Sequence, residues 1–196
     1  HVISTGKEAQ VFIATDLAGK KRAVKIFMKE TTLFGKMAMY IEGDRRFKNL
    51  RRDKRNLVLA WTKKEYKNLH MASEFNLSVP MPYAYKENVL VMEFIGEGDE
   101  PSLRLKDTNP TVVELENYRE QIIEFMAGLY LAGLIHADLS EYNILVHEGK
   151  LVVIDMGQAA LLTHPNDKDF FERDVKNMAI YFTKNGLEIR RKNQIR

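Results

Sequence analysis

Three polar residues in the second half of the chain stand beside short apolar runs and could together act on a phosphate group. Asp138 and Asn143 flank a loop between two apolar runs, and Asp155 ends a third. A carboxylate at the first position can orient an attacking oxygen or accept its proton. An amide oxygen and a second carboxylate can hold Mg²⁺ on nucleotide phosphates. These residue types predict metal-assisted phosphoryl transfer.

Each of these residues also has an ordinary structural explanation. Asp and Asn are common in turns because their side chains hydrogen-bond to the nearby backbone, and Asp155 could simply follow the end of a strand. One such residue alone is more typical of a turn than of a ligand. Three of them at matching spacings around apolar segments favour the phosphotransferase site. Within it we interpret His136 as a structural residue and assign the base role to Asp138.

Two further charged residues lie where apolar residues are expected. Lys25 is inside the apolar strand predicted over 22–27, and Glu65 falls on the apolar stripe of the helix predicted over 56–72. Burying either charge without a partner is costly. A buried ion pair between Lys25 and Glu65 accounts for both positions. The alternatives are that Lys25 points to solvent and that Glu65 pairs with Lys64 or Lys67.

Two backbone segments could contact a nucleotide. The turn that begins at Ser4, with Gly6 as its glycine, leads into a predicted hairpin (4–14 with 22–27) and could place N–H groups over phosphates. A plain hairpin lead-in explains it equally well. The apolar strand predicted over 89–94 ends in a Gly-containing break. We interpret this break as an interlobe hinge where backbone groups of Glu93 and Ile95 could meet an adenine edge, the alternative being a linker without a ligand.

The remaining pattern predicts mainly helices around the catalytic segment. Thr111 and Glu114 form a capping-box signature for a helix that ends near Gly133. A hairpin between 144–146 and 151–154 should bring Asn143 close to Asp155. A last helix is predicted over 167–185. Its Asp174 is expected to anchor the catalytic loop, the alternative being an exposed Asp.

Residues 28–55 break the regular pattern and predict a flexible basic loop or a frayed helix start. Such charge runs are usually solvated, but they can also contact a polyanion. We expect this loop to touch RNA or an acidic partner. Its basic residues are Arg45, Arg46, Lys48, Arg51, Arg52, Lys54 and Arg55.

The composition is that of a soluble globular protein. The chain has 196 residues with 45% hydrophobic and 29% charged side chains, enough for one or two small lobes. The absence of cysteine excludes disulfides and thiolate metal sites and suits a cytoplasmic protein. No apolar run reaches the roughly 18 residues of a membrane span. The first residue is His1 rather than Met, which is consistent with a fragment.

Taken together, the motifs resemble the RIO family of atypical serine/threonine protein kinases, in particular its type-one, archaeal-like branch. The resemblance implies an α+β, two-lobed protein-kinase-like fold. Its β-rich N-lobe would cover 1–95 and its mainly helical, truncated C-lobe 96–196, with ATP and Mg²⁺ or Mn²⁺ between them. The matching segments are Ser4–Ala9, Ala23–Ile26, Trp61–Glu65, Met92–Ile95, His136–Asn143 (H-A-D-L-S-E-Y-N) and Ile154–Gly157 (I-D-M-G).

The resemblance also implies a role for each matched position. The expected roles are the ion pair for Lys25 and Glu65, phosphate contacts for Ser4 and Lys7, adenine contacts for Glu93 and Ile95, the catalytic base for Asp138, and metal binding for Asn143 and Asp155. Asp155 could in addition become phosphorylated in an ATPase cycle. The family is associated with serine autophosphorylation, ATPase activity and late maturation of the small ribosomal subunit. The pre-ribosomal subunit, its rRNA and the chain's own serines are therefore expected partners, without a membrane.

Three departures from ordinary kinases disfavour recognition of a peptide substrate. The phosphate loop keeps only Gly6, Ala137 replaces an arginine, and no A-P-E element follows Asp155. These features fit an ATP-driven assembly factor better than a signalling kinase. The alternatives are a ribosome- or RNA-binding module that uses ATP as a conformational switch, and a small-molecule phosphotransferase.

Overall fold

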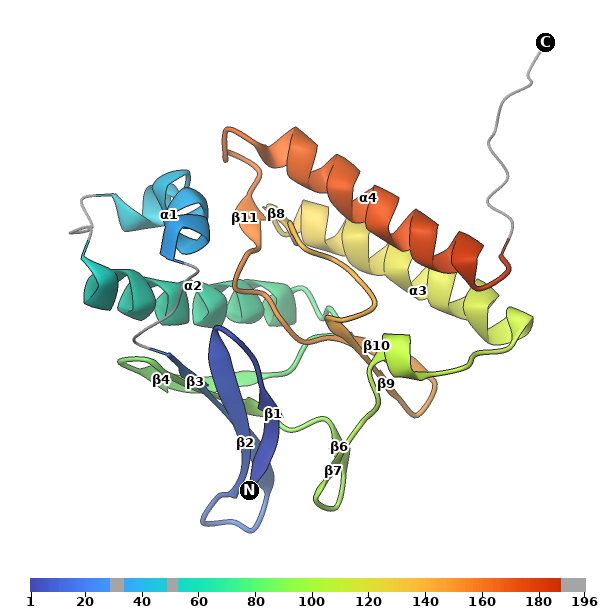
Figure 1. Cartoon of the computed structure of the whole chain (residues 1–196), viewed down its shortest axis with the longest axis horizontal. Helices are drawn as coiled ribbons and strands as arrows, with labels where there is room; N and C mark the ends of the chain where they lie inside the picture. Colours follow the sequence, from blue (N-terminus) through green and yellow to red (C-terminus); the bar gives the residue numbers. More distant parts are fainter. Residues whose placement is uncertain (29–33, 49–52, 188–196) are drawn as a thin grey trace.

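The computed structural model describes residues 1–28, 34–48 and 53–187, which form a sheet-rich half and a helical half (Figure 1). The sheet-rich half is an antiparallel sheet of order β1-β2-β3-β5-β4 covered by helix α2 (Lys54–Glu74). Its strands are β1 (Val2–Thr5), β2 (Ala9–Thr15), β3 (Lys21–Phe27), β4 (Pro82–Lys86) and β5 (Val89–Glu93). The alternation of β3 buries Ala23, Lys25 and Phe27 while Ile26 is exposed, so that Lys25 lies on the inner face.

The helical half is built from α3 (Val112–Leu131) and α4 (Asp167–Lys184), which both contact the short strand β8 (Leu134–Ile135). Strand β8 pairs with β11 (Ala160–Leu161), and the predicted hairpin is formed by β9 (Ile144–His147) and β10 (Lys150–Val153). The predicted capping box at Thr111 is present at the start of α3. The expected α+β, two-lobed kinase-like fold is therefore confirmed, while its boundary at residue 95 stays a prediction.

The segment between the halves folds back on itself and is fastened to the helical half. It contains the hairpin β6 (Gly96–Glu97) with β7 (Glu100–Pro101), followed by the 3-10 turn η2 (Leu105–Asp107). The Ser102 N–H donates to the Ile95 carbonyl (3.0 Å), and the Val146 N–H donates to the Leu103 carbonyl (2.9 Å). Ser102 Oγ and His147 Nδ1 lie 2.8 Å apart. The connecting segment is thus tied to β9.

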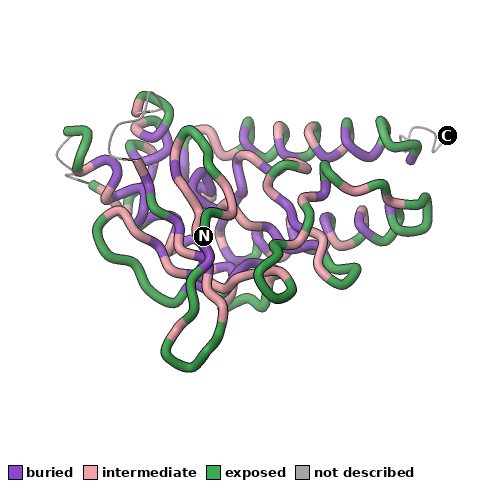
Figure 2. Tube along the Cα trace, turned by 60° about the horizontal axis from the view of Figure 1, so that its bottom comes forward, coloured by how far each residue is buried: buried purple, intermediate pink, exposed green. Residues whose placement is uncertain are grey.

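One continuous hydrophobic core joins the two halves. In Figure 2 buried residues recur along the inner sides of the helices, with exposed residues between them. Tyr40 packs against two other rings of this core, with centroid distances of 6.1 Å to Trp61 and 5.1 Å to Phe170. Because these rings come from different parts of the sequence, the core fixes the two halves relative to each other.

Within the segment 28–55, for which a flexible loop or a frayed helix start was predicted, residues 34–48 are mainly helical. These residues form α1 (Phe34–Glu42) and the 3-10 turn η1 (Arg45–Phe47). Met37, Tyr40 and Ile41 recur at helical spacing and are buried, so α1 has an apolar face that the surrounding charges concealed. The rest of that loop, residues 29–33 and 49–52, and the end of the chain from 188 lie outside the described residues.

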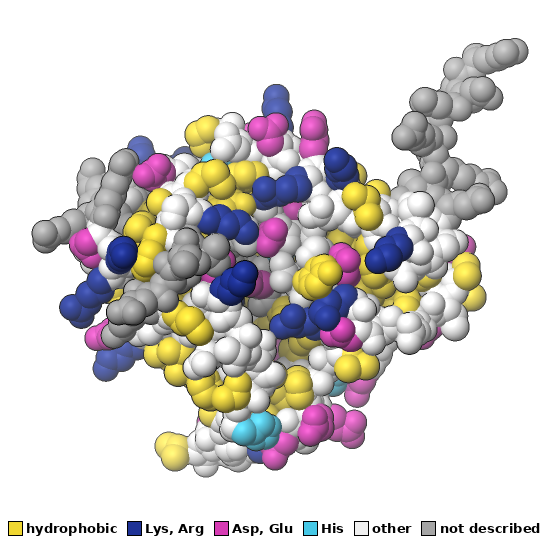
Figure 3. All heavy atoms as spheres, in the orientation of Figure 1, with side chains coloured by type: hydrophobic (Ala, Val, Ile, Leu, Met, Phe, Trp, Pro, Cys, Tyr) yellow, Lys and Arg dark blue, Asp and Glu magenta, His cyan; other side chains and the backbone are white. Residues whose placement is uncertain are grey.

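Basic and acidic side chains are interspersed on the face shown in Figure 3. Within the predicted basic run, Arg46 bonds inside the protein to Asp44 and Asn68, so this residue supports the fold. Arg45, Lys48, Lys54 and Arg55 are exposed. Across the described residues, no helix combines the length and apolar character needed to cross a membrane.

Candidate active site

A pocket of about 620 Å³ lies between the sheet and the helical half. Its wall is formed by the turn after β1, by β3 and β5, by the connecting segment and by the chain around Asn143 and Asp155. The predicted site residues that line it are Ser4, Lys7, Lys25, Glu93, Ile95, Asn143 and Asp155. Glu65 and Asp138 do not belong to this lining. The structure thus brings most of the predicted residues to one pocket.

Lys25 stands between two carboxylates on the wall of the pocket. Its Nζ lies 2.7 and 2.9 Å from the two carboxylate oxygens of Glu65 and 3.3 Å from Oδ1 of Asp155. The predicted Lys25–Glu65 ion pair is therefore present. Burial lowers the pKa of Lys25, but the charges of Asp155 and Glu65 raise it by more, so that the net pKa is raised and the ammonium stays protonated.

Asn143 and Asp155 are held side by side by the β9–β10 hairpin, as predicted. The Ile154 N–H donates to the Asn143 carbonyl (3.0 Å). The Asn143 amide nitrogen donates to the Asp138 carbonyl (3.0 Å), which leaves the amide oxygen for a ligand. Burial raises the pKa of Asp155, but Lys25, the Gly157 N–H and His136 together lower it by more, so the net pKa is lowered and the carboxylate is ionised.

These two side chains fit a magnesium ion that is shared with a nucleotide. Mg²⁺ prefers oxygen ligands and is often bound through one or two protein groups together with phosphate oxygens. Among the described residues, no group of three or more His, Cys, Asp or Glu could hold a metal. An amide and a carboxylate on the pocket wall therefore suit a cation that arrives with phosphates.

The loop that carries Asp138 is anchored by a buried carboxylate. Asp174 accepts the N–H groups of Ala137 (2.7 Å) and Leu139 (2.8 Å), which confirms the predicted anchor. Ala137 has φ of 66°, a conformation that costs energy for a residue other than glycine and that these bonds stabilise. His136 beside it is buried, and burial lowers its pKa to about 4, in agreement with a structural role.

Asp138 itself is oriented by a residue that the sequence had not indicated. Gln158 Nε2 donates to Asp138 Oδ2 (2.7 Å). Burial raises the pKa of Asp138, and the Gln158 bond opposes part of this rise. Gln158 follows Asp155 by three positions in a turn, and its position in the sequence carries no signal of this contact.

At the two ends of the pocket the backbone is arranged by local hydrogen bonds. At one end, the Gly6 N–H donates to the Ala9 carbonyl (3.0 Å). Arg104, which the sequence analysis did not identify, donates to Ser4 Oγ (3.3 Å). At the other end, the Glu93 carboxylate accepts the Met81 N–H (3.1 Å). The Ile95 carbonyl accepts from Ser102, so Ile95 would meet a nucleotide through its N–H. The nucleotide roles of these residues stay predictions.

Comparison with known proteins agrees with this geometry. The RIO domain family matches residues 10–195. This chain belongs to the RIO family. The RIO-type serine/threonine-protein kinase Rio1 of Haloferax volcanii is 44% identical over 95% of this chain and 63% of the relative. The protein of the same name from Thermoplasma acidophilum is 41% identical over 88% of this chain and 90% of the relative. The expected archaeal-like branch is thus confirmed.

The fold of this RIO chain also matches solved structures. A Rio2 kinase from Chaetomium thermophilum, described as an ADP/Mg²⁺-phosphoaspartate complex, superposes with a TM-score of 0.72. The match covers 98% of this chain and 57% of that one, at 21% identity. The likeness concerns the fold. The RIO chain spans only 63% of the length of the Haloferax relative.

Proposed function

We propose that this RIO chain is an ATP- and Mg²⁺-dependent atypical serine/threonine kinase that phosphorylates itself, an ATPase, or both. The observation that carries the proposal is the ammonium of Lys25, held between Glu65 and Asp155 on the wall of a pocket of nucleotide size. The relatives' name, RIO-type serine/threonine-protein kinase, supports it. So does the ADP/Mg²⁺-phosphoaspartate description of the Rio2 structure.

ATP would lie along the pocket with its phosphates towards Lys25. The charged Lys25 would contact the α- and β-phosphates, and Ser4 and Lys7 would cover them from the turn. The adenine edge would meet the Glu93 carbonyl and the Ile95 N–H. Asn143 and Asp155 would hold Mg²⁺ (Mn²⁺ being the alternative), which neutralises charge on the phosphates when bound.

Asp138 would serve as the base in transfer to a serine. The serine oxygen forms a bond to the γ-phosphorus as the bond to the β–γ bridging oxygen breaks, ADP leaves, and Asp138 accepts the hydroxyl proton. The raised pKa of Asp138 favours this proton transfer. In the ATPase route an ionised carboxylate oxygen of Asp155 would form the bond to the γ-phosphorus as the bond to the β–γ bridging oxygen breaks and ADP leaves. Water would then attack the phosphorus, releasing phosphate and restoring the Asp155 carboxylate.

The proposed setting is maturation of the small ribosomal subunit in the cytoplasm, with the pre-ribosomal particle and its rRNA as partners. The support is the family resemblance together with the exposed basic residues Arg45, Lys48, Lys54 and Arg55. The same residues favour a second candidate, an RNA-binding module that uses ATP as a conformational switch. That candidate predicts RNA affinity that falls steeply with salt and persists in a variant without turnover.

The test is incubation of the chain with Mg²⁺ and ATP labelled at the γ-phosphate. Label on serine, resistant to hydroxylamine, would indicate the kinase. Label that hydroxylamine removes, lost in Asp155→Asn, would indicate the acyl phosphate of the ATPase route. The absence of both label and phosphate release would refute the enzymatic proposal and leave the RNA-binding candidate.

A further inference from the structure

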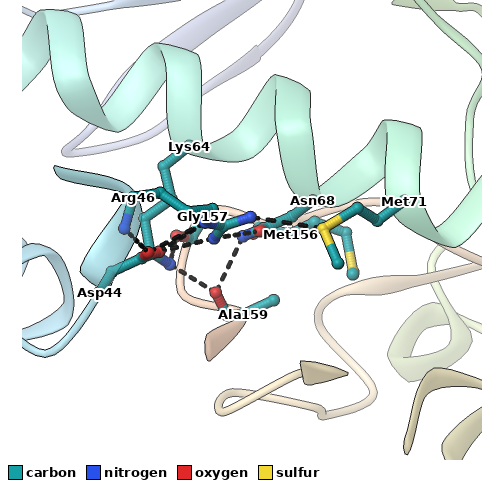
Figure 4. A network of polar contacts seen from close by, with 8 residues as sticks. All are labelled: Asp44, Arg46, Lys64, Asn68, Met71, Met156, Gly157 and Ala159. Atoms are coloured by element: carbon teal, nitrogen blue, oxygen red, sulfur yellow. Dashed lines mark hydrogen bonds and ion pairs between the residues drawn. The ribbon is translucent and has the colours of Figure 1, made fainter. Parts of the chain in front are cut away.

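Two polar side chains of α2, one turn apart, hydrogen-bond to the backbone that follows Asp155 (Figure 4). Lys64 and Asn68 are both fully buried. Lys64 Nζ donates to the carbonyls of Gly157 (2.9 Å) and Ala159. The amide nitrogen of Asn68 donates to the carbonyls of Met156 and Ala159 (2.8 Å each). Three backbone carbonyls of segment 156–159 thus accept from two side chains of one helix, and the Met156 carbonyl also accepts the Ala159 N–H (3.2 Å).

The orientation of Asn68 is set by a residue of η1 (Figure 4). Arg46 Nη2 donates to Asn68 Oδ1 (2.8 Å), so the amide nitrogen of Asn68 must face segment 156–159. Arg46 is itself held by Asp44, whose carboxylate accepts from Nη2 at 2.6 Å and from Nε at 2.9 Å. Asp44 is buried and also caps η1. The network therefore joins η1, α2 and segment 156–159.

The backbone of Gly157 also lies directly against α2. A Cβ atom at this position would lie 3.0 Å from Trp61 Nε1 and 3.1 Å from Glu65 Oε2. Contacts this close leave no room for a larger residue without movement. The helix that supplies Glu65 to Lys25 is therefore the same helix that holds the chain two residues after Asp155.

We propose that Lys64 and Asn68 are positioning residues for Asp155. By fixing the carbonyls of segment 156–159 to α2, they set the place of the Asp155 carboxylate relative to the Lys25–Glu65 pair. The inference rests on the proposed function in so far as Asp155 is a metal ligand. Buried carbonyls require partners, so loss of these donors would release the segment. A displacement of about 1 Å at a reacting centre can cost on the order of 100-fold in rate.

The variants Lys64→Met and Asn68→Leu remove the donors while keeping most of the side-chain volume. The probe is Mn²⁺, titrated into the ADP complex and followed by the paramagnetic resonance of the free ion. We expect about a 10-fold or larger loss of Mn²⁺ affinity in each variant. The affinity for ADP in EDTA should stay within about twofold, because Lys25 keeps both oxygens of Glu65 as partners. The matched control is Lys63→Met, at the exposed neighbouring position.

Hydrogen exchange on the same proteins separates positioning from general loss of stability. Amides of residues 157–161 should exchange at least about 10-fold faster in both variants, while those of α3 keep their wild-type rates. Uniformly faster exchange, or Mn²⁺ affinity equal to that of the wild type, would overturn the proposal. If Lys64→Met does not fold, Lys64→Gln, which keeps one donor group, and Arg46→Met, which frees the Asn68 amide, replace it and should show smaller effects in the same direction.

Turnover of ATP by the wild type is measured separately on the same preparation. A wild type that binds Mn²⁺ with ADP but neither hydrolyses ATP nor phosphorylates itself would refute the proposed function, while the Mn²⁺ affinities still decide the role of Lys64 and Asn68. A wild type that binds no Mn²⁺ in the ADP complex would overturn the positioning role.

Discussion

At the scale of single residues, Lys25 is buried and still charged because two carboxylates face its ammonium. Glu65 contributes both oxygens and Asp155 one. Glu65 is fully buried, and burial raises its pKa to about 7, with Lys25 opposing the rise. Because the pKa of Lys25 is raised, its positive charge is present through the neutral pH range and can attract the phosphates of a nucleotide.

The role of Asp138 can be tested by substitution. In Asp138→Ala we expect ATP turnover to fall by about 10²–10⁴-fold, the usual contribution of a positioned base. Nucleotide affinity should change little, because Asp138 does not line the pocket. Steady-state phosphate release and nucleotide titration measure the two effects. The control is Asp169→Ala, at an exposed Asp of α4. Equal losses in both variants would contradict the assignment.

Lys64 gives the stability of the protein a defined pH dependence. Burial lowers its pKa from 10.5 to about 7. Between these values the unfolded chain binds a proton that the native chain lacks, so the contribution of Lys64 to stability rises with pH and is lost as pH falls through about 7. We expect the free energy of unfolding of the wild type, minus that of Lys64→Met, to increase between pH 7 and 9.

The slope of this difference should approach about 1.4 kcal/mol per pH unit at most. Urea unfolding of both proteins across this range measures it. A difference that does not change with pH would show that Lys64 keeps its ordinary pKa in the native protein.

The residues that sequence reasoning could find are those that stand out from an apolar pattern. Lys25 and Glu65 were each isolated charges on an apolar face, so their pairing was predictable. Lys64 and Asn68 lie among charged neighbours and were not found. The alternative that Glu65 pairs with Lys64 is wrong, since Lys64 Nζ donates to backbone carbonyls. The bonds from Lys64 and Asn68 to segment 156–159 join residues about 90 positions apart in the sequence, and no local pattern predicts such contacts.

At the scale of elements, α2 is buried over more of its circumference than a surface helix. The predicted stripe of Leu57, Trp61, Glu65, Leu69 and Ala72 is buried. Val58, Ala60, Thr62, Lys64 and Asn68 are buried as well. The helix packs against strands of the sheet, against α1 and against segment 156–159. Because α2 is buried on several sides, its polar residues Lys64, Glu65 and Asn68 contact Lys25 and segment 156–159 instead of solvent.

A pair of glycine substitutions tests the contact between α2 and Gly157. Gly157→Ala should destabilise the protein by about 1–3 kcal/mol, because its Cβ would press on Trp61 and Glu65, and should reduce turnover by displacing Glu65. The control is Gly35→Ala in α1, where a Cβ meets nothing within 4 Å. There we expect unchanged turnover and a gain of up to about 1 kcal/mol. Chemical denaturation and ATP turnover measure both. Equal stability of Gly157→Ala and wild type would contradict the close packing.

At the scale of the whole molecule, the pocket is shared between the sheet and the helical half. A nucleotide in it would contact Lys25 from the first and Asn143 and Asp155 from the second. A ligand that binds only the native state stabilises it, by about 2.7 kcal/mol at a concentration 100 times its dissociation constant. We expect MgADP to produce this increase in the free energy of unfolding. At the same MgADP concentration, Lys25→Met should lose most of it.

Denaturant unfolding with and without MgADP measures this increase. The control is Lys21→Met, at the partly exposed start of the same strand, which should retain it. The same increase in Lys25→Met as in the wild type would place the nucleotide away from Lys25.

The overall architecture was predictable where motifs follow one another in order along most of the chain. The β-rich first half, the helices α2, α3 and α4 and the β9–β10 hairpin all correspond to sequence patterns. Strand β1 and the two-residue strands β8 and β11 were not predicted. Such short pieces contain too few residues to show a period, and they become strands only because the surrounding chain brings them together.

The bonds that tie the connecting segment to β9 determine which parts of the pocket can move together. Through Ser102 and Leu103, the backbone of Ile95 is joined to the strand that begins next to Asn143. The backbone from Ile95 onwards is thereby held by the helical half. We therefore expect Ile95 to keep its position relative to Asn143 whether or not a nucleotide is bound.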